Sequence, residues 1–238
     1  MEVRYVVFDL GSTLLQTPSA PTRKARRLLY FQRLFQLLRT QGLDRQVAGL
    51  ESLLEDQFAQ GLTAHIERLK GLGEDWTLRD SILHYLQEYL NSGKTEKSDI
   101  LDICHASVLI DDITRDESLI DTAGYEPWPD TLSTLQALKA LGLRTAVYIN
   151  TCSYAKAQKI LRETGVGKEL DYVFVSAETQ VQAPSREVNT VVLNTLGIAE
   201  KEVVYVGDML DRLIKSAQAA DLKAIWLNLN PSYPVFSI

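Results

Sequence analysis

Five short apolar runs, separated by stretches with helical periodicity, constrain the fold more than any other feature of this sequence. Each run is rich in Val, Ile and Tyr, which is typical of buried strands. The runs are residues 5–8, 145–149, 172–175, 203–206 and 224–227. Helical patterns accompany the later runs, at 131–141, 154–164, 186–196 and 210–220. Strand and helix in alternation predict an α/β fold with a Rossmann-like, doubly wound parallel sheet.

Glycines stand where three of the predicted helices should end. Gly142, Gly165 and Gly197 each follow the last residue of a helical pattern. Because glycine lacks a Cβ, it readily adopts the left-handed conformation that often closes a helix. We therefore expect a left-handed C-terminal cap at each of these positions.

A long stretch between the first two predicted strands, residues 16–124, contains no convincing strand. Apolar residues recur with helical spacing in four parts of it, at 22–40, 47–62, 77–90 and 97–110. Structureless loops longer than about 15 residues are uncommon in compact domains, so the stretch should fold as an all-helical insertion. We predict a cap domain at 16–124, over the carboxyl edge of the sheet, and a core domain formed by residues 1–15 and 125–238.

Composition and charge exclude several classes of function. The 238 residues are 45% hydrophobic and 24% charged, as in ordinary globular proteins. The net charge of −6 argues against a nucleic-acid partner, because phosphate binding requires a surplus of Lys and Arg on one face. The apolar run near the N-terminus is too short for a signal peptide or a membrane span, and Cys104 and Cys152 have no metal-ligand spacing. These features predict a cytoplasmic protein without a membrane partner.

The residues that follow the predicted strands are the candidates for chemistry, because ligands of open α/β sheets bind beyond the carboxyl ends of the strands. Asp9 follows the first strand, and Asp208 follows the fourth. Asn150 and Thr151 follow the second, and the loop after the third leads to Ala183 and Pro184. Two carboxylates that emerge from neighbouring buried strands repel one another unless a cation lies between them. A metal ion is therefore expected at Asp9 and Asp208.

The order of these motifs, together with the helical insertion, resembles the haloacid dehalogenase superfamily over nearly the whole chain. The insertion is similar to the C1-type helical cap of that family, residues 125–129 resemble the return from cap to core, and residues 204–208 resemble its fourth motif. The resemblance implies that Asp9 attacks a phosphoryl group as the nucleophile. It also implies a Mg²⁺ ion, held by the carboxylates of Asp9 and Asp208 and the carbonyl of Gly11. Asp211 is expected to substitute in part for the second acid of the fourth motif.

The departures from the family pattern are more informative than the matches. Family phosphatases have a second Asp, the general acid and base, where this chain has Gly11; its loss alone lowers the rate by about 10² to 10⁴. A family Ser or Thr is replaced by Ile149, although Asn150 and Thr151 stand beside it. The family lysine is replaced by Ala183, and removal of one fixed charge donor lowers a rate by about 10² to 10³. The expected second Asp of the fourth motif falls at Leu213.

Three functions are consistent with this pattern. The first is a haloacid-dehalogenase-like protein that keeps a Mg²⁺ and anion pocket, has lost ordinary phosphohydrolase turnover, and binds a small phosphorylated molecule or a protein. In such a pocket Asn150, Thr151 and Arg186 are the candidate phosphate ligands, with Lys156 and Lys159 as further candidate cations. The second is an active, Mg²⁺-dependent small-molecule phosphatase with Asp9 as its nucleophile. The third is an interaction module without a small ligand.

Two further patterns have simpler explanations. Basic residues recur through the predicted helix at 22–40, and charge runs on helices usually face water. His65, His84 and His105 are scattered through the insertion without the His-x-x-x-His spacing of a metal site and without an obvious carboxylate partner. The sequence therefore predicts a solvated helix face and histidines that are not metal ligands.

Overall fold

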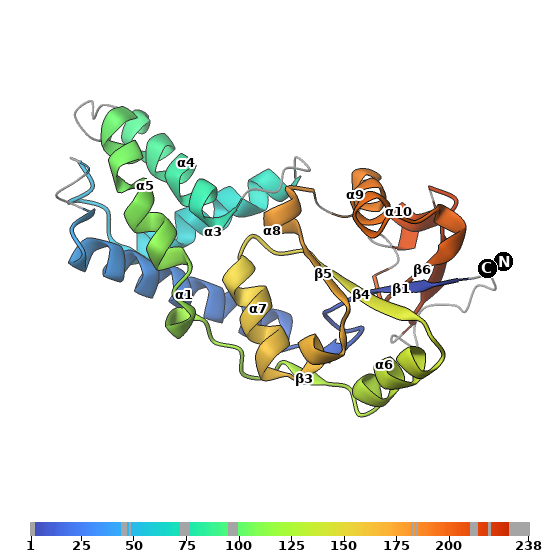
Figure 1. Cartoon of the computed structure of the whole chain (residues 1–238). Helices are drawn as coiled ribbons and strands as arrows, with labels where there is room; N and C mark the ends of the chain where they lie inside the picture. The colour runs from blue at the N-terminus through green and yellow to red at the C-terminus, as the bar shows by residue number, and fades with distance from the viewer. Residues whose placement is uncertain are drawn as a thin grey trace. The chain divides into compact units, whose positions relative to one another are not determined.

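The computed structural model describes residues 3–43, 47, 49–71, 77–94, 100–181, 183, 185–209, 214–218 and 220–228. The chain forms two compact units, which we call the α/β unit and the helical unit (Figure 1). The α/β unit comprises Met1–Thr17, Gly124–Thr151 and Ile160–Ile238, and the helical unit comprises Pro18–Ala123 and Cys152–Lys159. The domain boundaries inferred from the sequence, 15/16 and 124/125, and the location of the insertion as a cap stay predictions.

The α/β unit is built on a five-stranded sheet in which all pairings are parallel. The strand order is β5-β4-β1-β6-β7, so β1 is central, between β4 and β6. The strands are β1 (Tyr5–Asp9), β4 (Arg144–Ile149), β5 (Tyr172–Val175), β6 (Val203–Gly207) and β7 (Lys223–Trp226). Every predicted strand is present within one residue of its predicted start, and the predicted α/β fold class is confirmed.

Helices cover both faces of this sheet, as a parallel sheet requires. Tyr5, Val7 and Tyr205 pack on one face against apolar residues of α9 (Glu187–Leu196), whereas Val6 and Phe8, which alternate with them along β1, are buried on the other face. Figure 1 shows α9 and α10 on one side of the sheet and α6 on the other. The helices and turns of this unit are α6 (Thr131–Ala140), α7 (Tyr154–Glu163, whose first half belongs to the helical unit), η3 (Val166–Glu169), α8 (Ser176–Thr179), η4 (Glu200–Glu202) and α10 (Lys215–Gln218).

The three glycine caps are confirmed. Gly142, Gly165 and Gly197 have φ values of 77°, 74° and 63°, and a Cβ at any of them would meet no neighbouring atom within 4 Å. Glycine is therefore favoured at these positions by the positive φ and not by a lack of space for a side chain. Part of the predicted helix at 210–220 lies outside the described residues.

One small element was not predicted. β2 (Leu15–Gln16) pairs antiparallel with β3 (Glu126–Pro127), in the register Leu15 to Pro127 and Gln16 to Glu126. The hydroxyl of Thr131 also donates to the carbonyl of Leu14 at 2.7 Å. Strands of two residues leave no periodic signal in a sequence, so this contact is visible only in three dimensions.

The helical unit consists of helices with ordinary start signals. The hydroxyls of Ser19 and Thr77 accept hydrogen bonds from the N–H groups of Thr22 and Asp80, at 3.4 and 3.0 Å, and cap α1 and α4. The elements are α1 (Ala20–Thr40), α3 (Glu55–Gly71), α4 (Leu78–Tyr89), the π-helix η1 (Leu90–Lys94), α5 (Ile100–Thr114) and the 3₁₀ turn η2 (Glu117–Leu119).

The predicted helix at 47–62 is wrong in its first half. Helix α3 begins only at Glu55, and the described residues between 47 and 54 form turns. Gly49 has a φ of 90°, outside the helical range, and its N–H donates to the side chain of Glu51 at 3.0 Å. Leu50 and Leu53 are nevertheless fully buried, so their apolar spacing reflects burial of a turn.

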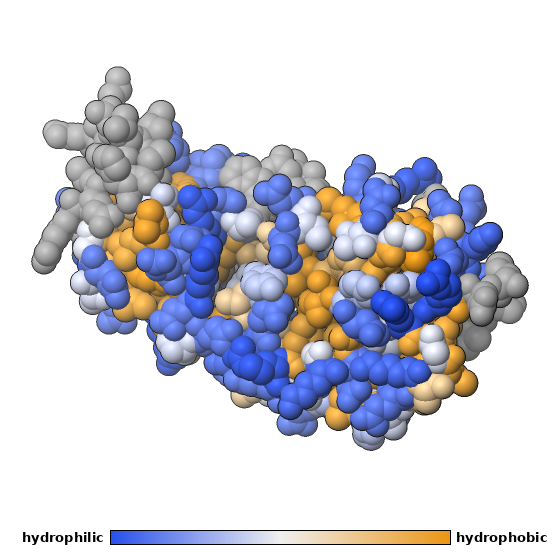
Figure 2. Space-filling view, viewed as in Figure 1, coloured by the Kyte–Doolittle hydropathy of each residue, from blue (hydrophilic) through white to orange (hydrophobic). Residues whose placement is uncertain are grey.

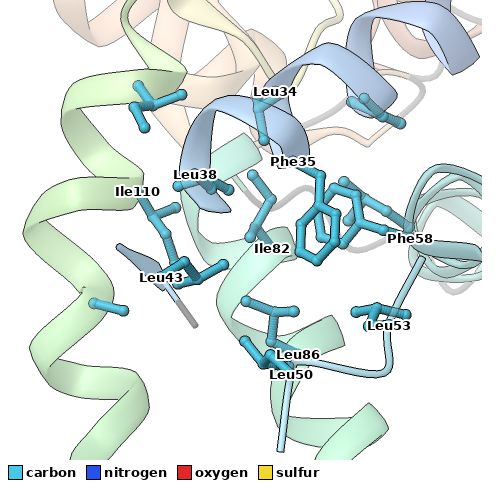
Figure 3. Close-up of a cluster of buried hydrophobic side chains, with 14 of the residues drawn as sticks. Leu34, Phe35, Leu38, Leu43, Leu50, Leu53, Phe58, Ile82, Leu86 and Ile110 are labelled. Carbon is cyan, nitrogen blue, oxygen red and sulfur yellow. The ribbon is translucent and has the colours of Figure 1, made fainter. Parts of the chain in front are cut away.

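Apolar side chains from these helices form one core (Figure 3). Phe35 of α1 and Phe58 of α3 are stacked with their ring centroids 4.3 Å apart and an interplanar angle of 12°. Ile82 and Leu86 of α4 and Ile110 of α5 are fully buried beside them. The helical unit therefore has a hydrophobic core of its own, as expected of a domain.

The basic residues of α1 are largely paired within the helical unit. Arg26 forms an ion pair with Asp121 at 3.1 Å, and Arg39 forms one with Glu55 at 3.8 Å. Arg27 pairs with Glu67. Pairs this exposed contribute about 0–1 kcal/mol each. The observation supports the prediction of a solvated helix face.

No helix among the described residues has the length and apolar character to cross a membrane. Figure 2 shows hydrophilic side chains interspersed with apolar ones on the visible face. Large exposed apolar side chains occur in both units, for example Val108 in α5 and Ile225 in β7.

The stacked aromatic pair yields a stability prediction. Phe58→Ala should lower the free energy of unfolding by about 3–5 kcal/mol, because it removes a fully buried ring and leaves a cavity beside Phe35. Leu54→Ala, whose side chain is 55% exposed, should change it by about 0.5 kcal/mol or less. Urea unfolding followed by circular dichroism measures both variants, and equal losses would contradict the packing described here.

Candidate functional site

The carboxyl ends of four adjacent strands bring the candidate residues together in the α/β unit. β1 pairs with β6 in the register Phe8 to Val206, so Asp9 and Asp208 leave neighbouring strands at the same edge. Asn150 leaves β4 on the other side of β1. The acids are half-buried, and this edge is where open α/β sheets bind ligands.

The loop after β1 is tight and holds the Asp9 carboxylate. Asp9 Oδ1 accepts a hydrogen bond from the N–H of Leu10 at 2.7 Å. The N–H of Ser12 donates to the carbonyl of Leu15 at 2.7 Å, and Ser12 has a φ of 61°, which is uncommon for a residue with a side chain. Backbone strain of this kind is typical of functional loops.

Thr13 connects the loops after β1 and β6. Its hydroxyl donates to Asp208 Oδ1 at 3.3 Å and accepts from the N–H of Asp208 at 3.1 Å. The indole of Trp226, at the end of β7, donates to the carbonyl of Asp208 at 2.9 Å. Asp208 is therefore positioned by neighbours on both sides of β6. No local sequence signal indicates this role of Thr13, because its partner is 195 residues away.

Asn150 is hydrogen-bonded to the backbone of Ala183, and its contact with a phosphate stays a prediction. Asn150 Oδ1 accepts from the N–H of Ala183 at 3.3 Å, and Asn150 Nδ2 donates to the carbonyl of Ala183 at 3.4 Å. Ala183 is 6% exposed, and its side chain belongs to the core beneath the sheet edge. The amide of Asn150 therefore joins the loops after β4 and β5, with a buried methyl group where the resemblance places a lysine.

Ser176 fixes the loop that carries Thr151. Its side chain is fully buried; the hydroxyl accepts from the N–H of Thr151 at 2.8 Å and donates to the carbonyl of Thr151 at 3.1 Å. The N–H of Ala177 donates to the same carbonyl at 3.0 Å. Ser176 was not predicted as a site residue, since a serine at a strand end is common without such a role.

Gly11 is not required by the backbone. Its φ is not in the left-handed region, and a Cβ built there would lie 3.4 Å from Thr17 Cγ2, at ordinary contact distance, with no other atom within 4 Å. A residue with a side chain therefore fits at this position. The family pattern has an acid at this position, and the local geometry does not require its absence here.

The remaining candidate cations and acids are placed as follows. Arg186 lies directly before α9, is exposed, and forms no side-chain hydrogen bond or ion pair within the described part of the chain. Lys156 and Lys159 lie in the part of α7 that belongs to the helical unit. The ammonium of Lys159 donates to the carbonyls of Glu117 and Ile120, at 2.9 and 2.7 Å. Asp211, the fourth predicted metal ligand, lies outside the described residues.

The expectation that the histidines have no carboxylate partner is wrong for His65 and His84, and the side chain of His105 lies outside the described residues. His65 of α3 and His84 and Glu88 of α4 form a cluster in the helical unit, in which His65 Nδ1 lies 3.1 Å from Glu88 Oε2 and His65 Nε2 lies 3.3 Å from His84 Nδ1. Burial lowers the pKa of His65 and outweighs the opposing charge of Glu88. The available signal was the spacing of His84 and Glu88, which places both on one face of a helix.

Comparison with known proteins finds a matching family and similar structures over nearly the whole chain. Residues 3–221 match a family described as haloacid dehalogenase-like hydrolase. A 2-haloacid dehalogenase from Pseudomonas syringae pv. Tomato has a similar structure, with a TM-score of 0.56 over 99% of this chain and 90% of that one, at 18% sequence identity. Another dehalogenase structure gives a TM-score of 0.54 over 98% and 88% of the two chains, at 15% identity. At these identities the structural likeness concerns the fold.

Curated relatives match over a shorter part. A glyceraldehyde 3-phosphate phosphatase from Methanocaldococcus jannaschii is 33% identical over 99 residues, which are 42% of this chain and 43% of that protein. A phosphoserine phosphatase from Thermus thermophilus is 24% identical over 112 residues, 46% of this chain and 45% of the relative. The chain thus matches less than half the length of each of these curated relatives.

The contact between Asn150 and Ala183 is testable by unfolding. Asn150→Ala should lower the free energy of unfolding by about 1–3 kcal/mol, because the N–H and carbonyl of the buried Ala183 lose their partners. Asn194→Ala, at an exposed position of α9, is the control and should change the stability by about 0.5 kcal/mol or less. Urea denaturation of the two variants compares them directly; an Asn150→Ala variant as stable as the control would rule out the structural role.

Proposed function

Since the chain belongs to the haloacid dehalogenase-like hydrolase family, we propose that it binds a small phosphorylated molecule together with Mg²⁺ at the carboxyl edge of its sheet, with little or no hydrolytic turnover. Asp9 and Asp208 are the retained acids of this site. Asn150, Thr151 and Arg186 are the side chains proposed to contact the phosphate, and a protein partner is the alternative ligand.

The contact between Asn150 and Ala183 carries this proposal. A phosphoryl-transfer site requires fixed positive charge where negative charge develops in the transition state. At the position of the family lysine, this chain has a methyl group buried in the core, and the neighbouring amide holds the loop in that arrangement. Together with Gly11 in place of the general acid, the arrangement supports binding more than turnover.

The donor set at the strand ends fits Mg²⁺. Magnesium prefers oxygen ligands, usually one or two carboxylates, and keeps several waters. The Asp9 and Asp208 carboxylates would hold the ion with the carbonyl of Gly11, and Asp211 is proposed as a further ligand. When bound, the ion would offset the charge of a phosphate group. Thr13 would keep the Asp208 carboxylate in position, through the two hydrogen bonds described above.

An active phosphatase is the second candidate, and a specific observation favours it. The curated relatives from Methanocaldococcus jannaschii and Methanopyrus kandleri, 33% and 28% identical over 99 and 103 residues, are both named glyceraldehyde 3-phosphate phosphatase. In that case Asp9 would be the nucleophile, and water or a substrate group would replace the missing acid. The two candidates differ in a measurable rate.

Turnover distinguishes these candidates. With Mg²⁺, the wild-type protein should hydrolyse p-nitrophenyl phosphate and glyceraldehyde 3-phosphate no faster than Asp9→Asn, because the general acid and the lysine are absent. Gly11→Asp should raise the rate by about 10² or more, since it restores the acid at a position where a Cβ meets only ordinary contacts. Gly11→Asn, in which an amide replaces the carboxylate, should not raise the rate. Brisk wild-type turnover that Asp9→Asn abolishes would establish the active phosphatase instead.

Metal binding is tested by thermal denaturation. Mg²⁺ at about ten times its dissociation constant should raise the melting temperature by about 2–4 °C, because the ion binds the folded state preferentially. Asp208→Asn should remove this increase in melting temperature. Asp221→Asn is the control: it alters an exposed acid with a φ of 56° and should retain the increase. If millimolar Mg²⁺ leaves the wild-type melting temperature unchanged, an interaction module without a small ligand becomes the better explanation.

A further inference from the structure

The cluster of His65, His84 and Glu88 has the composition of a transition-metal site. Each of the three residues offers one ligand atom, and these atoms all lie within 4.8 Å of one another. Imidazole nitrogen and carboxylate oxygen are the ligands that Zn²⁺ accepts beside thiolate. The ligands come from two helices, α3 and α4, which pack against each other in the same unit.

The spacing of the two imidazoles fits a shared metal ion. His65 Nε2 and His84 Nδ1 are 3.3 Å apart. Two nitrogens that bind one tetrahedral Zn²⁺ at about 2.0–2.1 Å are separated by about 3.3–3.4 Å. The separation suits one ion, and the rings have to turn from their present hydrogen bond so that both nitrogens face the ion. Glu88 Oε1 lies 4.0 Å from His84 Nδ1, so the partly exposed side chain of Glu88 has to shift to complete the set.

Burial divides the cluster into a fixed part and an accessible part. The side chain of His65 is 2% exposed and lies in the packed interior, whereas those of His84 and Glu88 are 39% and 44% exposed. A cation therefore reaches the cluster from solvent, and the remaining coordination position is open to water.

Arg68 is the charged group that competes with a cation here. Its Nη2 lies 3.0 Å from His65 Nδ1 and donates to Glu88 Oε1 at 2.7 Å. Its side chain is 52% exposed and is able to turn outward. Glu88 Oε1, which Arg68 holds, is also the oxygen that lies 4.0 Å from His84 Nδ1, so Arg68 has to turn away or share this oxygen with the ion, as a group that orients a metal ligand from the outer shell does.

We propose that His65, His84 and Glu88 bind a divalent transition-metal ion, Zn²⁺ by preference, and that this ion joins α3 to α4. The site uses neither Asp9 nor Asp208, and it does not depend on the proposed phosphate-binding function. Its effect is structural: an ion that binds only when the two helices are packed together stabilises the helical unit.

Titration of the metal-free full-length protein with Zn²⁺ tests the site. Calorimetry should show that Zn²⁺ binds. At a Zn²⁺ concentration of about ten times the dissociation constant, the melting temperature should rise by about 2–4 °C. Co²⁺ should give the intense visible absorption of a tetrahedral nitrogen and oxygen site. His84→Ala and the more conservative Glu88→Gln should each weaken Zn²⁺ binding about tenfold or more. Both positions are partly exposed, and circular dichroism verifies that the variants fold.

Two control variants distinguish this site from the strand-end acids. Asp112→Asn, an exposed acid of α5, and Asp208→Asn should both keep wild-type affinity for Zn²⁺ at the histidine cluster. Binding that survives in both His84→Ala and Glu88→Gln would overturn the proposal, as would a wild-type protein that Zn²⁺ neither binds nor stabilises. Loss of binding in Asp208→Asn alone would place the ion at the strand ends and would equally overturn it.

Discussion

The central position of β1, between two parallel neighbours, is the constraint on which the candidate site depends. Because β4 and β6 lie on either side of β1 and run parallel to it, the loops that follow these three strands all begin at one edge of the sheet. Residues that are far apart in the chain become neighbours there, and hydrogen bonds connect them: Thr13 with Asp208, 195 positions away, and Asn150 with Ala183, 33 positions away. The loops are thus held by contacts with one another as well as by hydrogen bonds inside each loop.

The elements of the fold were predictable where a local pattern determines them. Buried strands such as β1 and β6 are short apolar runs, and Gly142, Gly165 and Gly197 stand where a left-handed conformation closes a helix. The prediction failed where two causes produce the same pattern. Leu50 and Leu53 have the spacing of a helix but are buried by a turn that Gly49 begins. The paired strands β2 and β3 are too short to produce a hydrophobic periodicity in the sequence.

The residues of the candidate site were predictable from the sequence, and the contacts between them were less so. Strand-end positions pointed to Asp9, Asp208, Asn150 and Thr151, and the structure brings their loops to one edge. The partner of each polar group was not predictable, because a hydrogen bond between distant residues leaves no trace in local spacing. Asn150 illustrates the difference: its position at a strand end was predictable, whereas its hydrogen bonds to the backbone of Ala183, in another loop, were not. The histidine cluster was missed for the same reason, since His65 comes from another helix than His84 and Glu88.

The space around Gly11 has a consequence for the loop after β1. A Cβ at that position would meet only the methyl group of Thr17 within 4 Å, and the φ of Gly11 is outside the left-handed region that favours glycine. The path of the loop therefore does not depend on glycine there. The groups that this loop presents to a ligand and the backbone that supports them are thus free to vary separately.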